Sequence, residues 1–357
     1  MRYKEDWEMA KKRHAALWER EIIDRCCIGV TARRKNAKLW EKERIPTSDE
    51  ERTAFWTDPE WQIERGRREM ENTYFGGEAF PVMAAYLGAG GHAGFYKGAK
   101  HYFANDTVWF FPSLTDPDSL EFDENSFLYQ KTLELSRAFA QDSNGDYIVA
   151  MPDATGNADA LSHLMGPESL LTAMLDEPEA VKRALGKIQL AYEKVMKNVY
   201  DIVRDVNGGG SSVAWLHTWA PGFHSQMQCD MSVMISNPMF REFIRPELEK
   251  QSAFLEYPLY HFDGCEQIRH LDDLLAIPRL RLIQWTQVAG QRPCTDFFPE
   301  LKRIQEAGKC LFLSVSPDQI RPVMENLSSK GLYLFTRVDT QEAADAIIKE
   351  VARLTHE

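Results

Sequence analysis

The sequence has no run of about eighteen apolar residues, the length that a membrane-spanning helix requires. Its first residues lack the apolar core of a signal peptide, so we expect a cytoplasmic protein. Basic residues are in deficit: 42 Lys and Arg stand against 54 Asp and Glu, which gives a formal net charge of -12. A chain this acidic repels DNA, RNA and anionic membranes overall, and we expect none of them as a partner.

Cysteine pairs with redox or metal-site spacing are absent as well. The six cysteines form no Cys-x-x-Cys pair and show no regular framework spacing. A chain of 357 residues can bury a large core without disulfides, so we expect reduced thiols. The sequence also contains no internal repeat and no low-complexity tract.

The first 75 residues are rich in charge and tryptophan. Apolar residues recur at helical spacing in residues 7–26 and again in residues 60–71. We therefore expect a helical N-terminal extension over residues 1–75, followed by a larger unit over residues 76–357.

Beyond residue 80, short apolar runs alternate with amphipathic stretches, the pattern of parallel strands joined by covering helices. The runs number eight, which is the count that closes a barrel. They are residues 81–87, 107–110, 147–151, 212–217, 259–262, 280–285, 310–315 and 332–336. The pattern predicts an α/β fold, a (β/α)8 TIM barrel, with a doubly wound open sheet as the alternative.

In such a barrel the catalytic residues lie at the carboxyl ends of the strands. The fifth run ends in His261 and Asp263, and residues two apart on an extended segment point to the same side. We therefore expect this pair to be catalytic and to bind a zinc ion. The alternative is that the two side chains hydrogen-bond each other and the substrate.

A catalytic zinc ion needs a third protein ligand. The segment after the fourth run offers several candidates, of which Cys229 is one. The other candidates are Asp230, His217 and His224.

Polar and aromatic residues near the other strand ends suit the binding of a small organic substrate. The expected substrate-binding residues are His217, Trp219, Gln284, Trp285, Gln287 and Arg337. Asp153 follows the third run and is expected to be a general acid or base, with capping of the next helix as the alternative.

From about Trp215 to its end, the sequence resembles the uroporphyrinogen decarboxylase superfamily, which includes corrinoid-dependent methyltransferases. Residues 235–248, ISNPMFREFIRPEL, are similar to the superfamily's helix after strand four. Residues 260–264, YHFDG, fall where the methyltransferases have a His-x-Cys-Gly strand end. Gly308-Lys309 before a predicted strand, followed by Ser316-Pro317 and a predicted helix, are similar to the superfamily's last strand-helix units.

The resemblance implies methyl transfer between a small methylated substrate and a corrinoid (cobalamin) carried by a partner protein, with zinc at the strand end. The methyltransferases bind that zinc through the histidine, the cysteine of the strand end and a later cysteine. Here Asp263 replaces the first cysteine, and residues 332–340 contain none, so Cys229 would complete the site. The expected partners are a small-molecule substrate, a corrinoid-binding protein and a second copy of the chain in a homodimer.

Two other functions are compatible with these residues. In a decarboxylase or other lyase, Asp153 or Asp263 would handle the proton and Arg337 would bind a carboxylate. The superfamily's decarboxylases grip a tetrapyrrole through an arginine-rich N-terminal segment, and Arg33-Arg34 does not match its spacing. A substrate with many carboxylates is therefore not expected. The remaining alternative is a non-catalytic barrel that binds a corrinoid or another small ligand.

Overall fold

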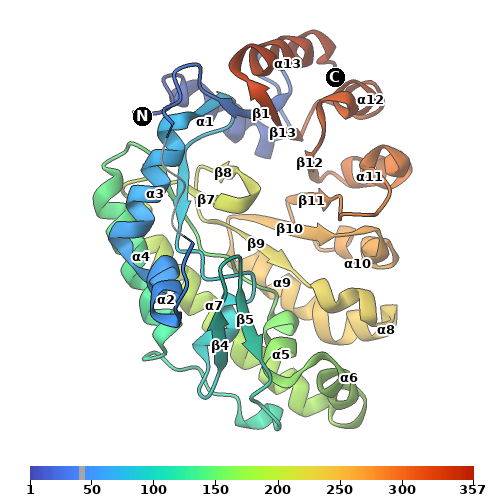
Figure 1. The fold of residues 1–357 in the computed structure, drawn as a ribbon. Helices are drawn as coiled ribbons and strands as arrows, with labels where there is room; N and C mark the ends of the chain where they lie inside the picture. The colour runs from blue at the N-terminus through green and yellow to red at the C-terminus, as the bar shows by residue number, and fades with distance from the viewer. Residues whose placement is uncertain (40–44) are drawn as a thin grey trace.

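The computed structural model describes residues 1–39 and 45–357, and Figure 1 shows strands enclosed by helices. The strands of this part are β1 (Cys27–Arg33), β2 (Thr73–Gly77), β3 (Val82–Ala84), β4 (Lys100–Phe103), β5 (Val108–Phe111), β6 (Ile148–Ala150), β7 (Ser211–Val213), β8 (Thr218–Ala220), β9 (His224–Gln228), β10 (Tyr257–Asp263), β11 (Leu282–Thr286), β12 (Cys310–Ser314) and β13 (Leu332–Thr340).

The α-helices are α1 (Trp7–Trp18), α2 (Asp49–Thr57), α3 (Pro59–Asn72), α4 (Phe127–Ser143), α5 (Asn157–Met165), α6 (Pro167–Asp176), α7 (Pro178–Val203), α8 (Asn237–Met239), α9 (Arg245–Phe254), α10 (Leu271–Leu275), α11 (Phe298–Glu306), α12 (Ile320–Asn326) and α13 (Gln341–Leu354). Two short 3-10 helices matter for the site, namely η3 (Ala214–Leu216) and η4 (Asp230–Met234).

The main sheet has seven strands in the order β2-β1-β13-β12-β11-β10-β9. All neighbours from β1 to β9 run parallel, and β2 pairs antiparallel with β1 at one edge. A parallel β3–β6 pair lies outside this sheet, and a bridge between Met151 and Val213 links the end of β6 to β7. The arrangement is mixed α/β and barrel-like. Among the described residues no ladder joins β3 to β1 or β2, so ring closure stays a prediction.

Most of the predicted strands are present, but one is misplaced. Residues 108–111 form β5, which among the described residues pairs only with β4, in an antiparallel hairpin outside the main sheet. The prediction that the second run is a barrel strand is therefore wrong. The fourth predicted strand, residues 212–217, is shorter than expected because the chain turns into η3 after Val213. Strands β1 and β9 belong to the main sheet and were not predicted.

The N-terminal segment is not purely helical. Helix α3 confirms the predicted stretch at residues 60–71, whereas α1 covers only residues 7–18 of the stretch predicted at residues 7–26. Between them, however, β1 lies inside the main sheet between β2 and β13, so the expected helical extension is corrected. Whether residues 1–75 form a separate unit stays a prediction.

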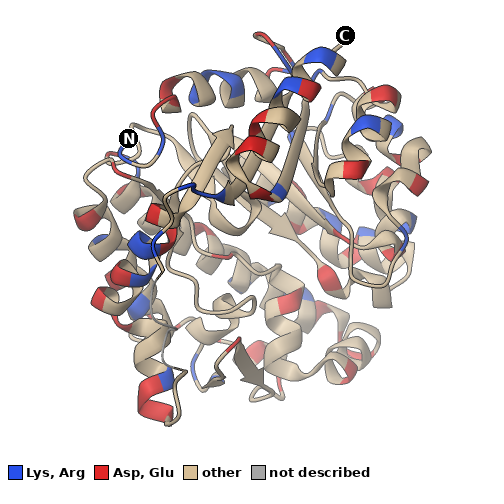
Figure 2. Ribbon diagram, turned by 45° about the horizontal axis from the view of Figure 1, so that its top comes forward, with Lys and Arg blue, Asp and Glu red and all other residues tan. Residues whose placement is uncertain are grey.

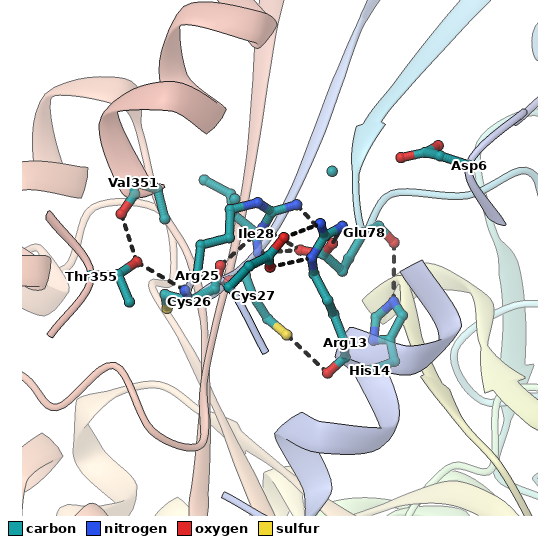
Figure 3. Close-up of polar contacts among 12 residues, drawn as sticks. Asp6, Arg13, His14, Arg25, Cys26, Cys27, Ile28, Glu78, Val351 and Thr355 are labelled. Atoms are coloured by element: carbon teal, nitrogen blue, oxygen red, sulfur yellow. Dashed lines mark hydrogen bonds and ion pairs between the residues drawn. The ribbon is translucent and has the colours of Figure 1, made fainter. Parts of the chain in front are cut away.

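The buried carboxylate of Glu78 connects this N-terminal segment to the sheet through hydrogen bonds and ion pairs, as Figure 3 shows. Glu78 is fully buried (0% exposed) and receives two hydrogen bonds from the Arg25 guanidinium, at 2.6 and 2.8 Å. It also accepts the Ile28 backbone N–H at 2.8 Å, and Arg13 of α1 lies 3.3 Å away. Because one carboxylate holds α1 and β1 together, we assign Glu78 a structural role.

Charged residues lie mainly on the outer helices and loops, while the strands carry few, as Figure 2 shows. The parallel strands are covered by helices, and their residues are therefore apolar on the helix-facing side. No helix of the described residues is long and apolar enough to cross a membrane.

Candidate active site

Two neighbouring parallel strands carry an aspartate at their carboxyl ends: Asp230 lies two residues after β9, and Asp263 is the last residue of β10. In the register of β9 and β10, Gln228 pairs with His261. Asp230 and Asp263 follow two residues later, and residues two apart on an extended segment share a face. The structure gathers Asp230, His261 and Asp263, whose ligand atoms all lie within 4.8 Å of one another. We call this group the Asp-His-Asp cluster.

His261 is held in one orientation by β11. Its Nδ1 hydrogen-bonds to the amide oxygen of Gln284 and lies 3.2 Å from Thr286 Oγ1. Because the amide oxygen accepts, Nδ1 carries the proton and the Nε2 lone pair is left free. Nε2 lies 3.7 Å from Asp263 Oδ1. Burial lowers the pKa of His261, so the imidazole is neutral, the form that binds a metal ion.

Asp230 is the least satisfied member of the cluster. It accepts a hydrogen bond from Gln228 Nε2 at 3.1 Å, but its Oδ1 is buried without a hydrogen-bond partner among the described residues. Burial, and then the negative charges of Asp159 and Asp263, raise the pKa of Asp230 to about 9. At neutral pH such a carboxyl group therefore requires either a proton or a nearby cation.

Asp159 on α5 fixes the backbone that carries Asp230. Its two carboxylate oxygens accept the backbone N–H groups of Asp230 and Met231, at 2.9 and 2.8 Å. Helix α5 comes this close because Gly156 precedes it: a Cβ at residue 156 would lie 2.2 Å from the Gln228 carbonyl oxygen. Sequence analysis missed Asp159 and Gly156, since neither lies directly at a strand end.

Asp153 follows β6, and its negative charge contributes to the raised pKa of Asp230 in the cluster. Its Oδ1 accepts a hydrogen bond from Gln226 Nε2 at 2.6 Å. Burial raises the pKa of Asp153 to about 7, a value suited to a general acid or base. The alternative role as helix cap is wrong, because the N-cap of α5 is Gly156. Catalysis by Asp153 stays a prediction.

The short helix η3 and the residue after it contact both the cluster and a neighbouring cavity, which is lined by His217, Arg33 and Arg337. Trp215 packs edge-on against His261, with ring centroids 4.8 Å apart. Two residues later, His217 stacks on Phe335 of β13, with centroids 4.3 Å apart and nearly parallel planes. The backbone of His217 is left-handed (φ 50°), which turns the chain back into β8.

The cavity has a volume of about 530 Å³ and includes His217 in its wall. It lies at the carboxyl ends of β1 and β13, where Arg33 and Arg337 line it. Apolar side chains, among them Met70 and Phe80, form much of the remaining wall. The Asp-His-Asp cluster does not line this cavity, so the molecule presents two adjacent polar regions joined by η3.

Gln284 is the predicted substrate-binding residue that the structure places at the cluster, through its contact with His261. His217 and Arg337 lie at the cavity. Gln287 is exposed in the loop after β11 and accepts a hydrogen bond from Gln319 at 3.3 Å. Substrate binding by these residues stays a prediction.

The two predicted substrate-binding tryptophans are core residues instead. Trp285 stacks on Phe262 with centroids 4.7 Å apart, on the side of the sheet opposite to Gln284, because successive residues of a strand face opposite sides. Trp219 is 5% exposed and packs against Trp7 of α1, with centroids 5.7 Å apart. Their contacts assign both residues to packing, which corrects the expectation.

The third candidate ligand also differs from the expectation. Burial raises the pKa of the Cys229 thiol well above its usual value, and Cys229 is not in the cluster of described residues that could hold a metal ion. Its neighbour Asp230, where η4 begins, takes that place. His224 is excluded because it lies at the start of β9 and is bonded to Thr218 and to the Tyr257 carbonyl.

Comparison with known proteins supports the fold. No protein-family model matches the chain, and no curated protein matches its sequence. Among solved structures, the chain is similar to a methyltransferase from Methanosarcina mazei, with a TM-score of 0.62 and 13% sequence identity. The match covers 96% of this chain and 98% of that one. The two proteins therefore share a fold over nearly their full lengths, while membership of the uroporphyrinogen decarboxylase superfamily stays a prediction.

Proposed function

We propose that this chain is a methyltransferase that moves a methyl group from a small methylated substrate to a corrinoid carried by a partner protein. The observation that carries the proposal is the Asp-His-Asp cluster at the carboxyl ends of two adjacent strands. Its position matches the strand end at which the resemblance to corrinoid-dependent methyltransferases places zinc. The fold shared with a solved methyltransferase supports the same reading.

The residues of the cluster fit a divalent cation such as zinc. A neutral imidazole and two carboxylates are acceptable zinc ligands, and three protein ligands leave a position open for substrate. The Oδ1 of Asp230 has no competing hydrogen bond from any described residue, and a cation would stabilise the ionised form of this carboxyl group. When bound, such an ion would polarise the heteroatom that carries the methyl group.

Residues around the cluster prepare it for this role. Gln284 fixes the ring of His261 with Nε2 free, and Asp159 fixes the backbone of Asp230. Asp153, whose pKa burial raises to about 7, can supply a proton to the demethylated product as it leaves. Trp215, which is 39% exposed, packs edge-on against the His261 ring.

Methyl transfer to free cob(I)alamin, followed spectrophotometrically as methylcobalamin forms, tests the proposal without the partner protein. Methyl ethers, thioethers and methylamines would be offered as donors. We expect transfer from at least one class, and loss of turnover in His261→Ala with unchanged circular dichroism. His163→Ala is the matched control, because His163 is exposed on α5. Full activity of His261→Ala, or no transfer from any class, would contradict the proposal.

A decarboxylase or related lyase is the second candidate, and one observation favours it. Asp153 titrates near neutral pH, and Arg337 lines the neighbouring cavity where a carboxylate could bind. Release of carbon dioxide from a bound acid, without any corrinoid present, would select this function over methyl transfer.

A further inference from the structure

We infer that the cavity beside the Asp-His-Asp cluster binds a small organic anion through Arg33 and Arg337, and that the methyl donor carries a carboxylate or a similar anionic group. The identity of the ligand as methyl donor rests on the proposed function. The binding of an anion does not, because it follows from the cavity itself.

The two arginines project from neighbouring strands and have no partner within residues 1–39 and 45–357. In the register of β1 and β13, Thr31 pairs with Arg337, and Arg33 lies two residues further along β1. Both arginines line the cavity and are exposed. Within the described residues, neither guanidinium makes a hydrogen bond or an ion pair. The adjacent Arg34, by contrast, donates to the carbonyl oxygens of Thr73 and Tyr3.

Unpaired arginines on adjacent strands form a suitable receptor for an anion. Two positive charges at one cavity repel each other, and an anion between them removes that repulsion. The guanidinium fork also matches a carboxylate, sulfonate or phosphate in two parallel hydrogen bonds. The chain as a whole carries a net charge of -12, so a basic site on it is a local departure from the general charge.

His217 supplies a third polar group to the cavity. Its side chain is partly buried, and its buried Nδ1 has no hydrogen-bond partner among the described residues. Burial and the charge of Arg337 lower the pKa of His217 to about 4, so the ring is neutral and can donate or accept one hydrogen bond. A buried polar atom without a partner is costly unless a ligand or water satisfies it.

The remaining lining residues define the ligand further. Glu69 and Lys38 also line the cavity, and Lys38 lies 3.3 Å from Glu71. Basic groups therefore outnumber the single carboxylate among the described lining residues. Met70 and Phe80 give the wall an apolar part, and about 530 Å³ exceeds the space that a bare inorganic ion needs. The cavity thus favours an organic anion with an apolar body.

The connection to the cluster runs through η3. His217 lines the cavity, and Trp215, two residues before it, contacts His261. A ligand anchored at Arg33 and Arg337 whose body follows η3 would extend toward the cluster. This arrangement separates recognition of the anion from activation of the methyl group.

Calorimetric titration with two matched probes, 3-methoxybenzoate and its neutral amide 3-methoxybenzamide, tests the inference without corrinoid or turnover. We expect saturable binding of the acid and at least about tenfold weaker binding of the amide. Arg33→Gln and Arg337→Gln should each weaken binding of the acid about tenfold and leave the amide unaffected. Arg279→Gln is the control, because Arg279 is exposed and precedes β11 at the opposite end of the sheet.

Equal binding of acid and amide, no saturable binding of the acid, or an equal loss in Arg279→Gln would overturn the inference. The outcome is separable from that of the proposed function. Anion binding without any methyl transfer would leave the cavity assigned and remove the methyltransferase. Methyl transfer from neutral donors alone, unaffected by Arg337→Gln, would keep the methyltransferase and remove the anionic methyl donor.

Discussion

Trp215 packs edge-on against His261, with ring centroids 4.8 Å apart and an interplanar angle of 85°. The indole is 39% exposed, so it contacts both solvent and the histidine of the Asp-His-Asp cluster. The other side of His261 is fixed by Gln284. Anything that binds at the cluster therefore changes the surroundings of this one indole, which makes Trp215 a reporter for the site.

Titration of metal-free protein with zinc should change its tryptophan fluorescence. Most of the change should vanish in Trp215→Phe, because Trp215 is the indole in ring contact with a candidate ligand. Trp109→Phe is the control, since Trp109 is 57% exposed on β5 in the hairpin and should leave the change intact. An equal fluorescence change in the wild type and Trp215→Phe would show that Trp215 does not report on the metal site.

Asp159→Asn should weaken metal binding about 10- to 100-fold, the usual effect of losing a group that orients a ligand. The amide has one acceptor oxygen, so it cannot accept both backbone N–H groups, of Asp230 and Met231, with separate oxygens. Competition with a chelator of known affinity measures the change. Asp176→Asn, at an exposed position at the end of α6, is the control. An affinity within about twofold of the wild type would show that Asp159 does not position Asp230.

Glu78→Gln should destabilise the fold by about 3–5 kcal/mol, because it leaves the buried Arg25 guanidinium without its counter-charge. Urea unfolding measures the free energy. Glu19→Gln removes the partner of Arg281 at a carboxylate that is 64% exposed, and it should cost less than about 1 kcal/mol. Similar losses of unfolding free energy in the two variants would argue against Glu78 as the residue that connects α1 and β1.

Asp153 should make stability depend on pH between about pH 4 and pH 7. Burial raises the pKa of the carboxyl group from 3.8 in the unfolded chain to about 7 in the folded one. The folded state then holds the proton more tightly, so its stability falls as pH rises through this window and is constant above it.

Asp153→Asn removes this titration while keeping an acceptor for Gln226. Relative to the wild type, the variant should gain on the order of 2 kcal/mol across the window, after allowance for the partial exposure of residue 153. Urea unfolding at several pH values measures the difference. A difference that stays constant with pH would mean that Asp153 titrates normally.

The sequence predicts the central strands because β10 to β13 are apolar runs that stand out from their flanks. Strand β9 is not predicted because its residues, HSQMQ, are mostly polar and do not form an apolar run. All five are nevertheless buried. Several of these polar groups have partners, as Gln226 Nε2 has in the Asp153 carboxylate, although the amide oxygens of Gln226 and Gln228 have none among the described residues. Residues 107–110 have the composition of a strand, but composition does not tell a hairpin strand from a strand of the main sheet.

The candidate site is predictable only in part. The spacing of His261 and Asp263 on one strand places them together. The choice between Cys229 and Asp230 depends on where η4 begins, which no local pattern specifies. Trp285 fails as a site residue because alternation along β11 turns it away from the side that Gln284 occupies. Asp159 and Arg33 reach their positions through long-range packing that a single sequence does not reveal.

The metal content of the purified protein tests the central claim most directly. After exposure to zinc and removal of unbound ion, elemental analysis should find one equivalent in the wild type and none in Asp230→Asn, His261→Ala or Asp263→Asn, while Cys229→Ser keeps it. Circular dichroism confirms that each variant is folded. A wild type without zinc or another divalent metal, or zinc retained in the three cluster variants, would contradict the account.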